Sequence, residues 1–284
     1  MKILVTGAGG AMGRTLVRRL SSSPEHTVIA TYHRVDDTIE VASFQQIELD
    51  ITDTDQVDAA LQRMRPDAVV HLAALVGAAC ESDPDLAEKV NVEAVASLTE
   101  AAARHRVAKL VFISTAAVYG DGLSAPVSES HATHPTTTYA RTKLAAEEGL
   151  ENASRRSDTP DVVVLRVFNV WGDGFSTSLV ERLRTSSEAA PVMLNGLDTF
   201  LRDYVHVDDV VQACELALTA GLSRFEVVNI GSGVAVSNAD LVRWIARATP
   251  PVYEVVPAAT SYSCADIAKA ERVLGYSPEH TIIP

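Results

Sequence analysis

Tyr139 and Lys143 are the residues whose spacing most directly suggests acid–base chemistry. They lie in the segment Tyr-Ala-Arg-Thr-Lys, which puts a phenol and an ammonium one helical turn apart on one face of a helix. A free tyrosine has a pKa of about 10, and a nearby cation favours the phenolate and lowers that pKa. A tyrosine tuned in this way can exchange a proton with a sugar or steroid-like oxygen. Taken alone, the pair is better explained as an ordinary contact on a helix surface.

Hydroxyl groups at the end of a strand provide a partner for that phenol. Ser114 and Thr115 close an apolar run, residues 110–114, which is the fourth candidate parallel strand of the chain. A hydroxyl in this place can hold a substrate oxygen against the tyrosine, and we assign this role to Thr115. The alternative is a polar strand end that caps the next turn.

A glycine-rich turn near the first residue predicts a phosphate-binding element. The run Lys2–Val5 predicts a buried strand, and it leads directly to Gly7, Gly10 and Gly13, which recur every third residue. Glycines let the backbone turn tightly and approach a pyrophosphate, and the next helix offers free N–H groups at its N-terminus. Met12 stands where the common GxGxxG pattern has its last glycine. Ordinary turns also collect glycine, so the inference depends on the position directly after a strand.

The elements that must position these residues alternate between strand and helix. Continuous runs rich in β-branched residues predict buried strands, and the stretches between them predict helices. The predicted strands are 28–32, 68–72, 110–114 and 162–166, and the predicted helices are 12–21, 54–64, 86–105 and 138–155. This alternation indicates an α/β fold, a Rossmann-type doubly wound parallel sheet with helices on both faces.

The last third of the chain is less regular. Its predicted elements are helices at 178–185, 208–220, 238–248 and 267–274 and strands at 202–207 and 227–231, with Asp208 as a helix cap. We expect residues 1–166 to form a dinucleotide-binding Rossmann domain that is rejoined by about 200–220. Residues 167–284 are expected to form a smaller, discontinuous C-terminal substrate-binding domain over the carboxyl edge of the sheet, where ligands bind in open α/β sheets.

The bulk composition excludes several classes of function. The chain has 284 residues, a formal net charge of −13 and a pI of about 5.0, so it has no general attraction for nucleic acid or an anionic membrane. Cys80, Cys214 and Cys264 are too scattered for a disulfide framework, and no His, Cys and Asp cluster has metal-ligand spacing. His206 and Trp171 are expected to be packing residues. Because no apolar run is long enough for a membrane span, we expect a cytoplasmic protein. From the spacing of the possible ligands, we expect no bound metal.

Together, the glycine turn, the strand-end hydroxyls and the Tyr-x-x-x-Lys pair resemble the extended short-chain dehydrogenase/reductase family. Within it, they resemble the branch of NAD(P)-dependent nucleotide-sugar epimerases, dehydratases and ketoreductases. Further segments look like blocks of this family in the family's order: Asp50–Ile51, His71–Ala74, Asn91, Phe168–Asn169, Arg202–Val207 and Asn229–Gly231. The resemblance extends over nearly the whole chain.

This resemblance implies roles for individual residues. The catalytic positions are Thr115, Tyr139 and Lys143, and Lys143 also holds the nicotinamide ribose. The positions that match the cofactor-binding residues are Gly7, Gly10, Ala11, Met12, Gly13, Tyr32, His33, Arg34, Asp50, Ile51, Leu72, Ala73, Ala74, Val76, Asn91, Ser114, Tyr139, Lys143 and Phe168. The substrate-binding positions are Thr115, Asn169 and Arg202, the last two at the diphosphate of a nucleotide-diphosphate sugar. The resemblance also implies a homodimer built on the helices 86–105 and 138–155, although these helices could instead simply cover the sheet.

One departure from the family pattern bears on the cofactor. Tyr32 stands where an acidic residue normally binds the adenosine ribose and favours NAD. His33 and Arg34 follow, and they would attract the 2′-phosphate of NADP. We therefore favour NADP(H) over NAD(H). In the alternative, Asp36 or Asp37 reaches the ribose.

Two further departures bear on the reaction. Ala116 and Ala117 replace the Asp-Glu pair that performs elimination in the related 4,6-dehydratases, so dehydration is not expected. The stretch 255–264 lacks the arginine that in the family provides a second contact to the diphosphate, so Arg202 acts alone or with Arg182 or Arg184.

The sequence therefore predicts an enzyme acting on a nucleotide-linked sugar. The leading hypothesis is an NADPH-dependent 4-ketoreductase of a nucleotide-diphospho-4-keto-6-deoxy sugar. The alternative is an NAD-dependent nucleotide-sugar 4-epimerase, which uses the same three catalytic residues. A third hypothesis is a non-catalytic module that senses a dinucleotide, which the intact Tyr139 and Lys143 pair disfavours.

Overall fold

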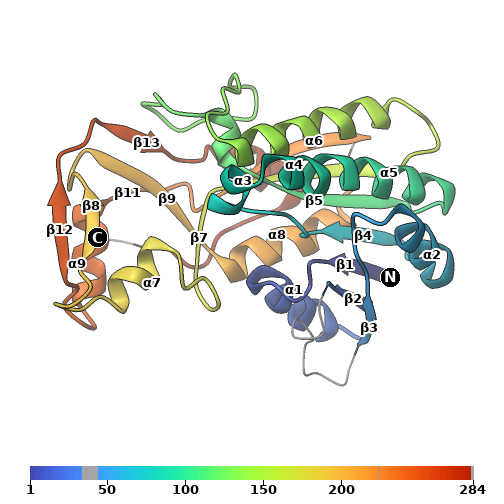
Figure 1. Ribbon diagram of the computed structural model, residues 1–284, viewed down its shortest axis with the longest axis horizontal. Helices are drawn as coiled ribbons and strands as arrows, with labels where there is room; N and C mark the ends of the chain where they lie inside the picture. Colours follow the sequence, from blue (N-terminus) through green and yellow to red (C-terminus); the bar gives the residue numbers. More distant parts are fainter. Residues whose placement is uncertain (34–43, 223, 283–284) are drawn as a thin grey trace.

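The computed structural model describes residues 1–33, 44–222 and 224–282. Its centre is a seven-stranded parallel sheet (Figure 1). Across the sheet the strands are, in order, β10 (Phe225–Ile230), β6 (Asp161–Val167), β5 (Lys109–Thr115), β4 (Ala68–His71), β1 (Lys2–Thr6), β2 (Thr27–Tyr32) and β3 (Gln45–Glu48). The strand order reverses between β1 and β4, where ligands bind in such sheets. The predicted Rossmann-type α/β fold is confirmed.

Two layers of buried apolar side chains hold helices against the faces of this sheet. One layer joins the sheet to α1 (Ala11–Ser21), α8 (Val207–Thr219) and α10 (Ala268–Leu274), and the other joins it to α2 (Thr54–Met64), α5 (Ala94–Arg104) and α6 (Thr138–Ser154). In β1, Ile3 and Val5 belong to the first layer and Leu4 to the second. Successive side chains of a strand point to opposite faces, so a strand covered on both faces reads as a continuous apolar run.

The predicted helix 86–105 is not continuous. The helices α3 (Ala78–Ser82) and α4 (Pro84–Glu88) come first, and a π-helical turn, η2 (Lys89–Glu93), then connects α4 to α5. Asp83 caps α4 by accepting a hydrogen bond from the Leu86 N–H. A π turn inside a helix is frequent at functional sites, and this one contains Asn91.

Several segments after β6 build a smaller part at one end of the molecule (Figure 1), while β10, α8 and α10 belong to the large sheet and its helix layer. The central strand of this smaller part is β9 (Phe200–His206), which pairs with β7 (Asn169–Trp171), β11 (Ala235–Ser237) and β13 (Ser261–Ser263). The two-stranded sheet of β8 (Val192–Asn195) and β12 (Tyr253–Val256) and the helices α7 (Leu179–Arg184) and α9 (Asn238–Ala246) complete it. A third apolar cluster, which includes Trp171, Tyr204 and Leu241, packs these elements together.

The strands that the sequence did not predict are short or half-exposed. They are β3, β7, β8, β11, β12 and β13. Each has only three or four residues, too few for a periodic pattern to stand out. The expected cap at Asp208 is also wrong, because α8 begins at Val207 and the His206 side chain accepts from the Asp208 N–H.

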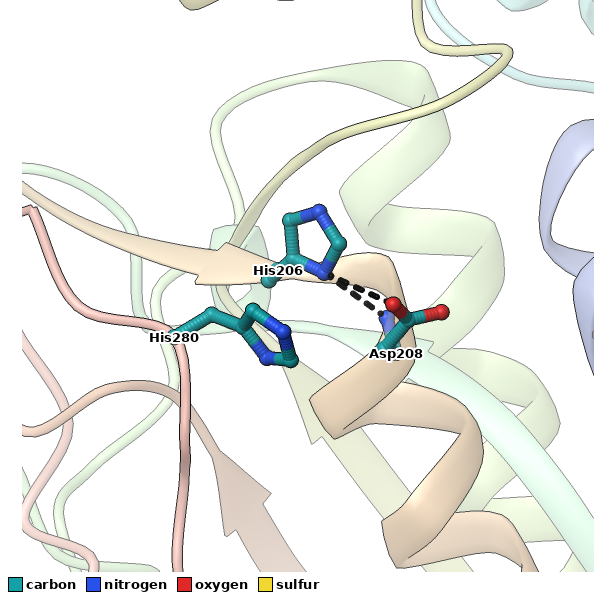
Figure 2. Close-up of side chains that lie close together, drawn as sticks. All are labelled: His206, Asp208 and His280. Atoms are coloured by element: carbon teal, nitrogen blue, oxygen red, sulfur yellow. Dashed lines mark hydrogen bonds and ion pairs between the residues drawn. The ribbon is translucent and has the colours of Figure 1, made fainter.

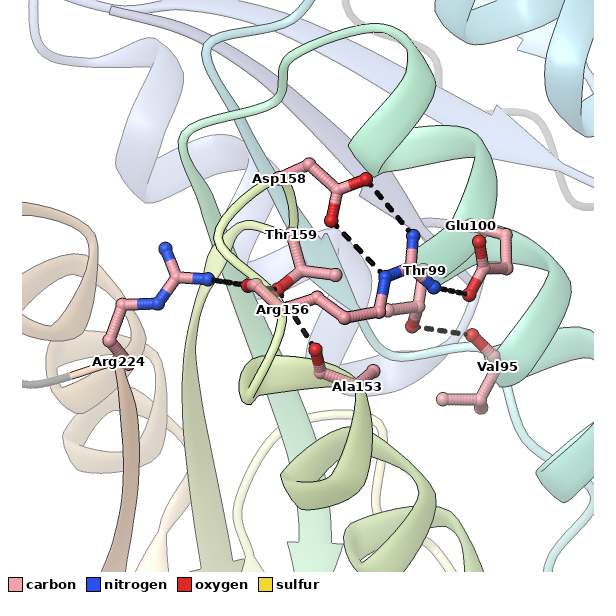
Figure 3. Close-up of polar contacts among 8 residues, drawn as sticks. All are labelled: Val95, Thr99, Glu100, Ala153, Arg156, Asp158, Thr159 and Arg224. Atoms are coloured by element: carbon pink, nitrogen blue, oxygen red, sulfur yellow. Dashed lines mark hydrogen bonds and ion pairs between the residues drawn. The ribbon is translucent and has the colours of Figure 1, made fainter.

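A charged network fastens the far end of α6 to its neighbours (Figure 3). Arg156, just beyond the helix, forms ion pairs with Asp158 and with Glu100 of α5. Arg224, just before β10, donates to the Arg156 carbonyl and to the Thr159 hydroxyl. Exposed ion pairs stabilise a fold only weakly, so their effect is to fix where α6 ends relative to α5 and β10.

Cys80, Cys214 and Cys264 are buried and form no disulfide. Within the described parts of the chain, every helix is too short or too polar to span a lipid bilayer.

Candidate active site

The glycine-rich turn lies between the end of β1 and the start of α1. Gly7 has a φ of +68°, and a Cβ there would lie 2.6 Å from the backbone nitrogen of Ala73, directly after β4. Only glycine suits both the backbone conformation and this close approach. Gly10 directly precedes α1, and no side chain caps the helix among the described residues. The first N–H groups of α1 therefore remain available to an anion such as a phosphate.

A cavity of about 640 Å³, called the larger cavity here, opens beside this turn. Of the predicted cofactor-binding residues, those that line it are Gly7, Gly10, Tyr32, His33, Asp50, Ile51, Leu72, Ala73 and Ala74. The other lining residues are Thr6, Gly9, Thr31, Leu49, Thr52, Leu75, Leu86, Lys89 and Val90. Apolar walls, a few polar groups and a phosphate-binding turn fit a dinucleotide.

Asp50 offers one oxygen to a ligand in the larger cavity. Its Oδ1 accepts from the N–H and the hydroxyl of Thr52 at 2.9 and 2.8 Å. These hydrogen bonds lower the pKa of Asp50, so its carboxylate is ionised at neutral pH. Among the described residues no donor is bonded to Oδ2. This oxygen can accept from an amino or hydroxyl group, as the adenosine end of a dinucleotide requires.

The remaining predicted cofactor residues do not line the larger cavity. They are Ala11, Met12, Gly13, Val76, Asn91, Ser114, Tyr139, Lys143 and Phe168. Met12 packs against the apolar layer under α1, and the Ser114 hydroxyl donates to Glu147. Arg34, together with Asp36 and Asp37, lies outside the described residues.

Asn91 connects the wall of the larger cavity to α6. Its Oδ1 accepts from the Leu75 N–H at 2.9 Å, and its Nδ2 donates to the Leu75 carbonyl at 3.0 Å and to the Thr142 hydroxyl at 3.1 Å. The side chain is 1% exposed, so leaving these groups unpaired would be costly. Asn91 therefore fixes the cavity wall beside Lys143, the next residue of α6.

Residues before α6 fix its first turn, which carries Tyr139. Thr137 caps the helix by accepting from the Ala140 N–H. The Glu81 carboxylate accepts from the N–H and the hydroxyl of Thr138 at 2.6 and 2.7 Å. Glu81 was not recognised in the sequence, because its partner is 57 residues away.

Lys143 is one of the most deeply buried charged groups of the protein, at 3% exposed. Its Nζ lies 4.0 Å from the ring centroid of Phe112 in β5. Loss of hydration lowers the pKa of Lys143 to about 7, and Glu147 and Cys80 act in the opposite direction. A buried amine with a pKa near neutrality is typical of functional sites.

The expected lowering of the Tyr139 pKa by Lys143 is wrong for this structure. Desolvation raises the pKa of Tyr139 to about 12, and Cys80 adds to the increase. Lys143 is not among the groups that shift the phenol. Burial sets the direction of both pKa shifts, because the low dielectric disfavours the phenolate and the ammonium alike.

A second cavity, of about 200 Å³ and called the smaller cavity, brings together the three predicted substrate-binding residues. It is lined by Thr115, Ala116, Ala117, Gly120, Asp121, Val167, Phe168, Asn169, Arg202, Ser261, Tyr262 and Ser263. Thr115 also caps the 3₁₀ turn η3 (Ala116–Tyr119) by accepting from the Ala117 N–H at 3.2 Å. The two sequence interpretations of this strand end, a ligand contact and a cap, are therefore compatible.

Arg202 enters the smaller cavity from β9 with its guanidinium already oriented. Its two terminal nitrogens donate to the Leu201 carbonyl and to the Ser261 hydroxyl, each at 2.8 Å. The guanidinium lies 3.7 Å from the ring centroid of Phe200. Desolvation lowers the pKa of Arg202, and Tyr204 and Asp121 counteract this shift. Asp121 had no role in the sequence interpretation.

Asp203, which follows Arg202, joins β9 to two later segments. It is fully buried and accepts from Ser232, from Gly233 and from Ala265 at 2.6 to 3.1 Å. Burial raises the pKa of Asp203, and these hydrogen bonds oppose the increase. The carboxylate thereby fixes the strands that carry the wall of the smaller cavity.

Neither of the other two candidate arginines lines the smaller cavity. Arg184 forms an ion pair with Glu181 at 3.0 Å, and its guanidinium lies 5.5 and 5.1 Å from the rings of Trp171 and Trp244. Arg182 is on the same helix, α7. Among the described residues, Arg202 is the one arginine in this cavity.

Three side chains with metal-binding atoms gather away from both cavities (Figure 2). The ligand atoms of His206, Asp208 and His280 lie within 4.8 Å of one another. The spacing rules missed this group because His280 is remote in sequence. His206 Nδ1 accepts from the Asp208 N–H, and His280 Nδ1 is bonded to Asp209 at 3.0 Å. These bonds connect the start of α8 to the C-terminal segment, and the Trp171 ring meets the edge of His206.

Residues 3–231 match the model of the NAD dependent epimerase/dehydratase family. The chain is 30% identical over 308 residues to a UDP-glucose 4-epimerase of Corynebacterium glutamicum, with 99% of this chain and 92% of the relative covered. It is 34% identical to a probable dTDP-4,6-dihydroxy-2-methyloxan-3-one 4-ketoreductase of Streptomyces antibioticus, with 64% of this chain and 57% of the relative covered. Among solved structures, MoeE5 in complex with UDP-glucuronic acid and NAD is 32% identical, has a TM-score of 0.88, and is matched over 99% of this chain and 95% of its own.

Proposed function

The chain belongs to the NAD dependent epimerase/dehydratase family, and on this premise we propose that it is an NAD-dependent 4-epimerase of a nucleotide-diphosphate sugar. The observation that carries the proposal is Lys143 with Tyr139 on α6, which Asn91 ties to the wall of the larger cavity, together with a smaller cavity that contains Thr115 and Arg202. The ketoreductase hypothesis is less well supported. The relative with that activity matches 64% of this chain, whereas the 4-epimerase relative matches 99%.

NAD(H) is the better supported cofactor, and the preference for NADP(H) inferred from Tyr32 is not retained. The solved structure of MoeE5, reported above, contains NAD. Tyr32 and His33 line the larger cavity, but a neutral tyrosine does not exclude NAD. The chemistry that a bound nicotinamide dinucleotide supplies is the reversible two-electron oxidation of an alcohol carbon.

The residues of this chain would handle the proton and hold the substrate. In its phenolate form the Tyr139 oxygen takes the proton of the sugar C4 hydroxyl, and the resulting phenol later returns that proton, while the Thr115 hydroxyl holds the sugar oxygen. The Lys143 ammonium, one turn along α6 from Tyr139, would hold the nicotinamide ribose. Arg202 and Asn169 bind the diphosphate, for which a planar guanidinium is well suited. Ala116 and Ala117 carry no carboxyl group for the removal of water, so dehydration is not part of the proposal.

A uridine diphosphate hexose is the substrate class that we propose. The relative from Corynebacterium glutamicum is named for UDP-glucose, and MoeE5 was solved with a UDP-linked sugar acid. Asp121 gives the smaller cavity a carboxylate beside Arg202. A neutral hexose therefore suits this cavity better than a uronate, whose own carboxylate would be repelled.

The test is turnover of UDP-glucose and UDP-glucuronate by purified protein with catalytic amounts of NAD. We expect UDP-galactose to form from UDP-glucose with no net change in NADH absorbance. Stoichiometric NADPH consumption with a 4-keto-6-deoxy sugar nucleotide, without epimerisation, would instead identify a ketoreductase. NAD binding with no turnover of any sugar nucleotide would identify a sensing module.

Two further features are part of this proposal. The first is the division into a dinucleotide-binding domain, residues 1–166 with a later return, and a smaller substrate-binding domain. The second is a homodimer through α5 and α6. A shallow cavity of about 120 Å³ between these helices is lined mainly by small and apolar residues, among them Ala145, Gly149 and Ala153, which would let a second copy approach closely. Light scattering after size-exclusion chromatography tests the dimer.

A further inference from the structure

Glu147 lies on α6 one turn after Lys143, and it is 3% exposed. A spacing of four residues puts both side chains on the same face of the helix. Lys143 Nζ lies over the Phe112 ring of β5, and the Glu147 carboxylate accepts from the Ser114 hydroxyl of the same strand. Because Phe112 and Ser114 lie on the same face of β5, the two charged groups share one buried layer between α6 and β5.

Arg166 holds Glu147 from the neighbouring strand. It lies on β6 in register with Ser114 of β5. Its Nε and Nη2 donate to the Glu147 Oε2 at 3.0 and 2.6 Å, and the two side chains are 8% and 4% exposed. A guanidinium keeps its charge when buried, so Arg166 offers this carboxylate a paired, charge-assisted contact.

The other titratable groups that face Lys143 carry no negative charge. Burial lowers the pKa of His71 on β4 to about 3, so its imidazole is neutral. Burial raises the pKa of Cys80 on α3, so its thiol is protonated, and it raises the pKa of Tyr139 to about 12. Among the described residues, Glu147 is therefore the anionic side chain that acts on this ammonium.

We propose that Glu147, fixed by Arg166 and Ser114, is the buried counter-charge that keeps Lys143 protonated, and is thereby a positioning residue of the site. Lys143 loses its hydration between α6 and β5, which favours the neutral amine. A carboxylate on the next turn of the helix favours the ammonium. Glu147 lines neither cavity, so it acts through the lysine. Its effect on turnover, though not on the charge of Lys143, rests on the proposed function.

Removal of the Glu147 carboxylate should shift the pKa of Lys143 in one direction, downward. Burial lowers the pKa of Lys143 to about 7, and the charge of Glu147 opposes that shift. In Glu147→Gln the opposing charge is absent, so the pKa of Lys143 falls further. A close opposite charge shifts a pKa by roughly 1 to 3 units, and we expect a fall of at least about one unit.

The protonation of Lys143 can be measured without a substrate. The chain has only five lysines, Lys2, Lys89, Lys109, Lys143 and Lys269. NMR of protein labelled at the lysine ε-carbon therefore gives few resonances, and that of Lys143 is the one missing from Lys143→Met. We expect its titration midpoint to move to lower pH in Glu147→Gln. The midpoint should not move in the matched control Glu148→Gln, which removes an exposed carboxylate from the same helix. An unchanged midpoint in folded Glu147→Gln would overturn the proposal.

Glu147→Gln also leaves the Arg166 guanidinium buried without its partner, which destabilises the fold. The double variant Glu147→Gln/Arg166→Met removes both charges and provides a second test. Its Lys143 midpoint should lie below that of the wild type and above that of the single variant, because the repulsive guanidinium is also gone. A wild-type midpoint in the double variant would contradict the proposal even if the single variant did not fold.

Activity measurements distinguish a positioning role from a structural one. With UDP-glucose, Glu147→Gln should be closest to the wild type at low pH and should fall behind as the pH rises. Above both midpoints the deficit is about tenfold for each unit lost from the Lys143 pKa. An equal loss at every pH, with an unmoved midpoint, would indicate a structural role only. If the wild type epimerises nothing, the proposed function fails, while the NMR titration still decides the role of Glu147.

Discussion

The larger and the smaller cavity are built from different materials. Backbone and apolar side chains around the glycine turn form most of the larger cavity, and a Cβ on Gly7 would collide with the backbone of Ala73. Polar side chains dominate the smaller cavity, and Arg202 and Asn169 are each held by a hydrogen bond from within their own part of the chain. The shape of a cavity lined by backbone is set by a few local residues. The shape of a cavity lined by hydrogen-bonded side chains is set by every strand that carries one of the partners. Substitutions on distant strands can therefore change the smaller cavity without changing the larger one.

Tyr139→Phe should have the largest effect, because the phenol serves the reaction itself. We expect kcat to fall by roughly 100- to 10,000-fold, the usual contribution of one positioned acid–base group. Binding of NAD should be unchanged, because Tyr139 does not line the larger cavity. Calorimetric titration with NAD, alongside turnover of UDP-glucose, separates the two quantities. A near-normal rate in this variant would refute the role assigned to Tyr139.

Asp203→Ala should have the next largest effect, on stability. It leaves the donors of Ser232, Gly233 and Ala265 without their buried acceptor. Such a loss costs about 3 kcal/mol in the free energy of unfolding. Denaturant unfolding measures this cost, and the variant should retain the NAD affinity of the wild type while it remains folded. An equal loss of NAD affinity and of UDP-sugar affinity would show that the two cavities are not independent.

The same contrast explains what the sequence could and could not predict. Gly7, Gly10 and the strand before them form a local pattern in which each residue meets a demand of the backbone, so the larger cavity was largely recognisable. Asp121 and Asp203 act through partners that only the fold brings near, and no spacing identifies them. The short strands β8 and β12 pair with each other although they are far apart in the sequence, as in the pair of Val192 and Tyr253. Such a pairing leaves no local periodic signal. The π turn at Asn91 lies between two α-helices, and its sequence does not interrupt the helical pattern.

Burial, rather than sequence spacing, sets the direction of the pKa shifts of Tyr139 and Lys143. The spacing of Tyr139 and Lys143 correctly places them on one helix face. The direction of the phenol's shift depends on how much water the site excludes, which no spacing reports. Burial raises the pKa of Tyr139 to about 12 and lowers that of Lys143 to about 7. Spacing therefore identifies the pair, whereas the charge of each group depends on burial and on neighbours such as Glu147, which opposes the shift of Lys143.

The variant Gly7→Ala tests the close packing of backbone at the larger cavity, and Gly77→Ala is its matched control. Both glycines have a positive φ, of +68° and +58°, so alanine is strained at either position. Only at Gly7 would the new Cβ also collide with backbone, since nothing lies within 4 Å of a Cβ at Gly77. Strain alone costs about 1 kcal/mol. We expect Gly77→Ala to lose about that amount, and Gly7→Ala to lose about 2 kcal/mol and to bind NAD more weakly. Thermal unfolding and NAD titration of both variants provide the measurement, and equal behaviour of the two would contradict the close packing at Gly7.

Arg202→Lys should have the smallest effect, confined to the smaller cavity. Lysine keeps the positive charge but loses the planar pair of donors that suits a diphosphate. We expect KM for the UDP-sugar to rise about tenfold, or about 1.4 kcal/mol of binding free energy, with kcat and NAD affinity unchanged. Arg184→Lys is the matched control, because its guanidinium is engaged by Glu181 and two tryptophans outside both cavities. A rise in KM in the control equal to that in Arg202→Lys would place the diphosphate near α7 rather than in the smaller cavity. A rise confined to Arg202→Lys would instead show that an acidic protein can bind an anionic substrate through one desolvated guanidinium.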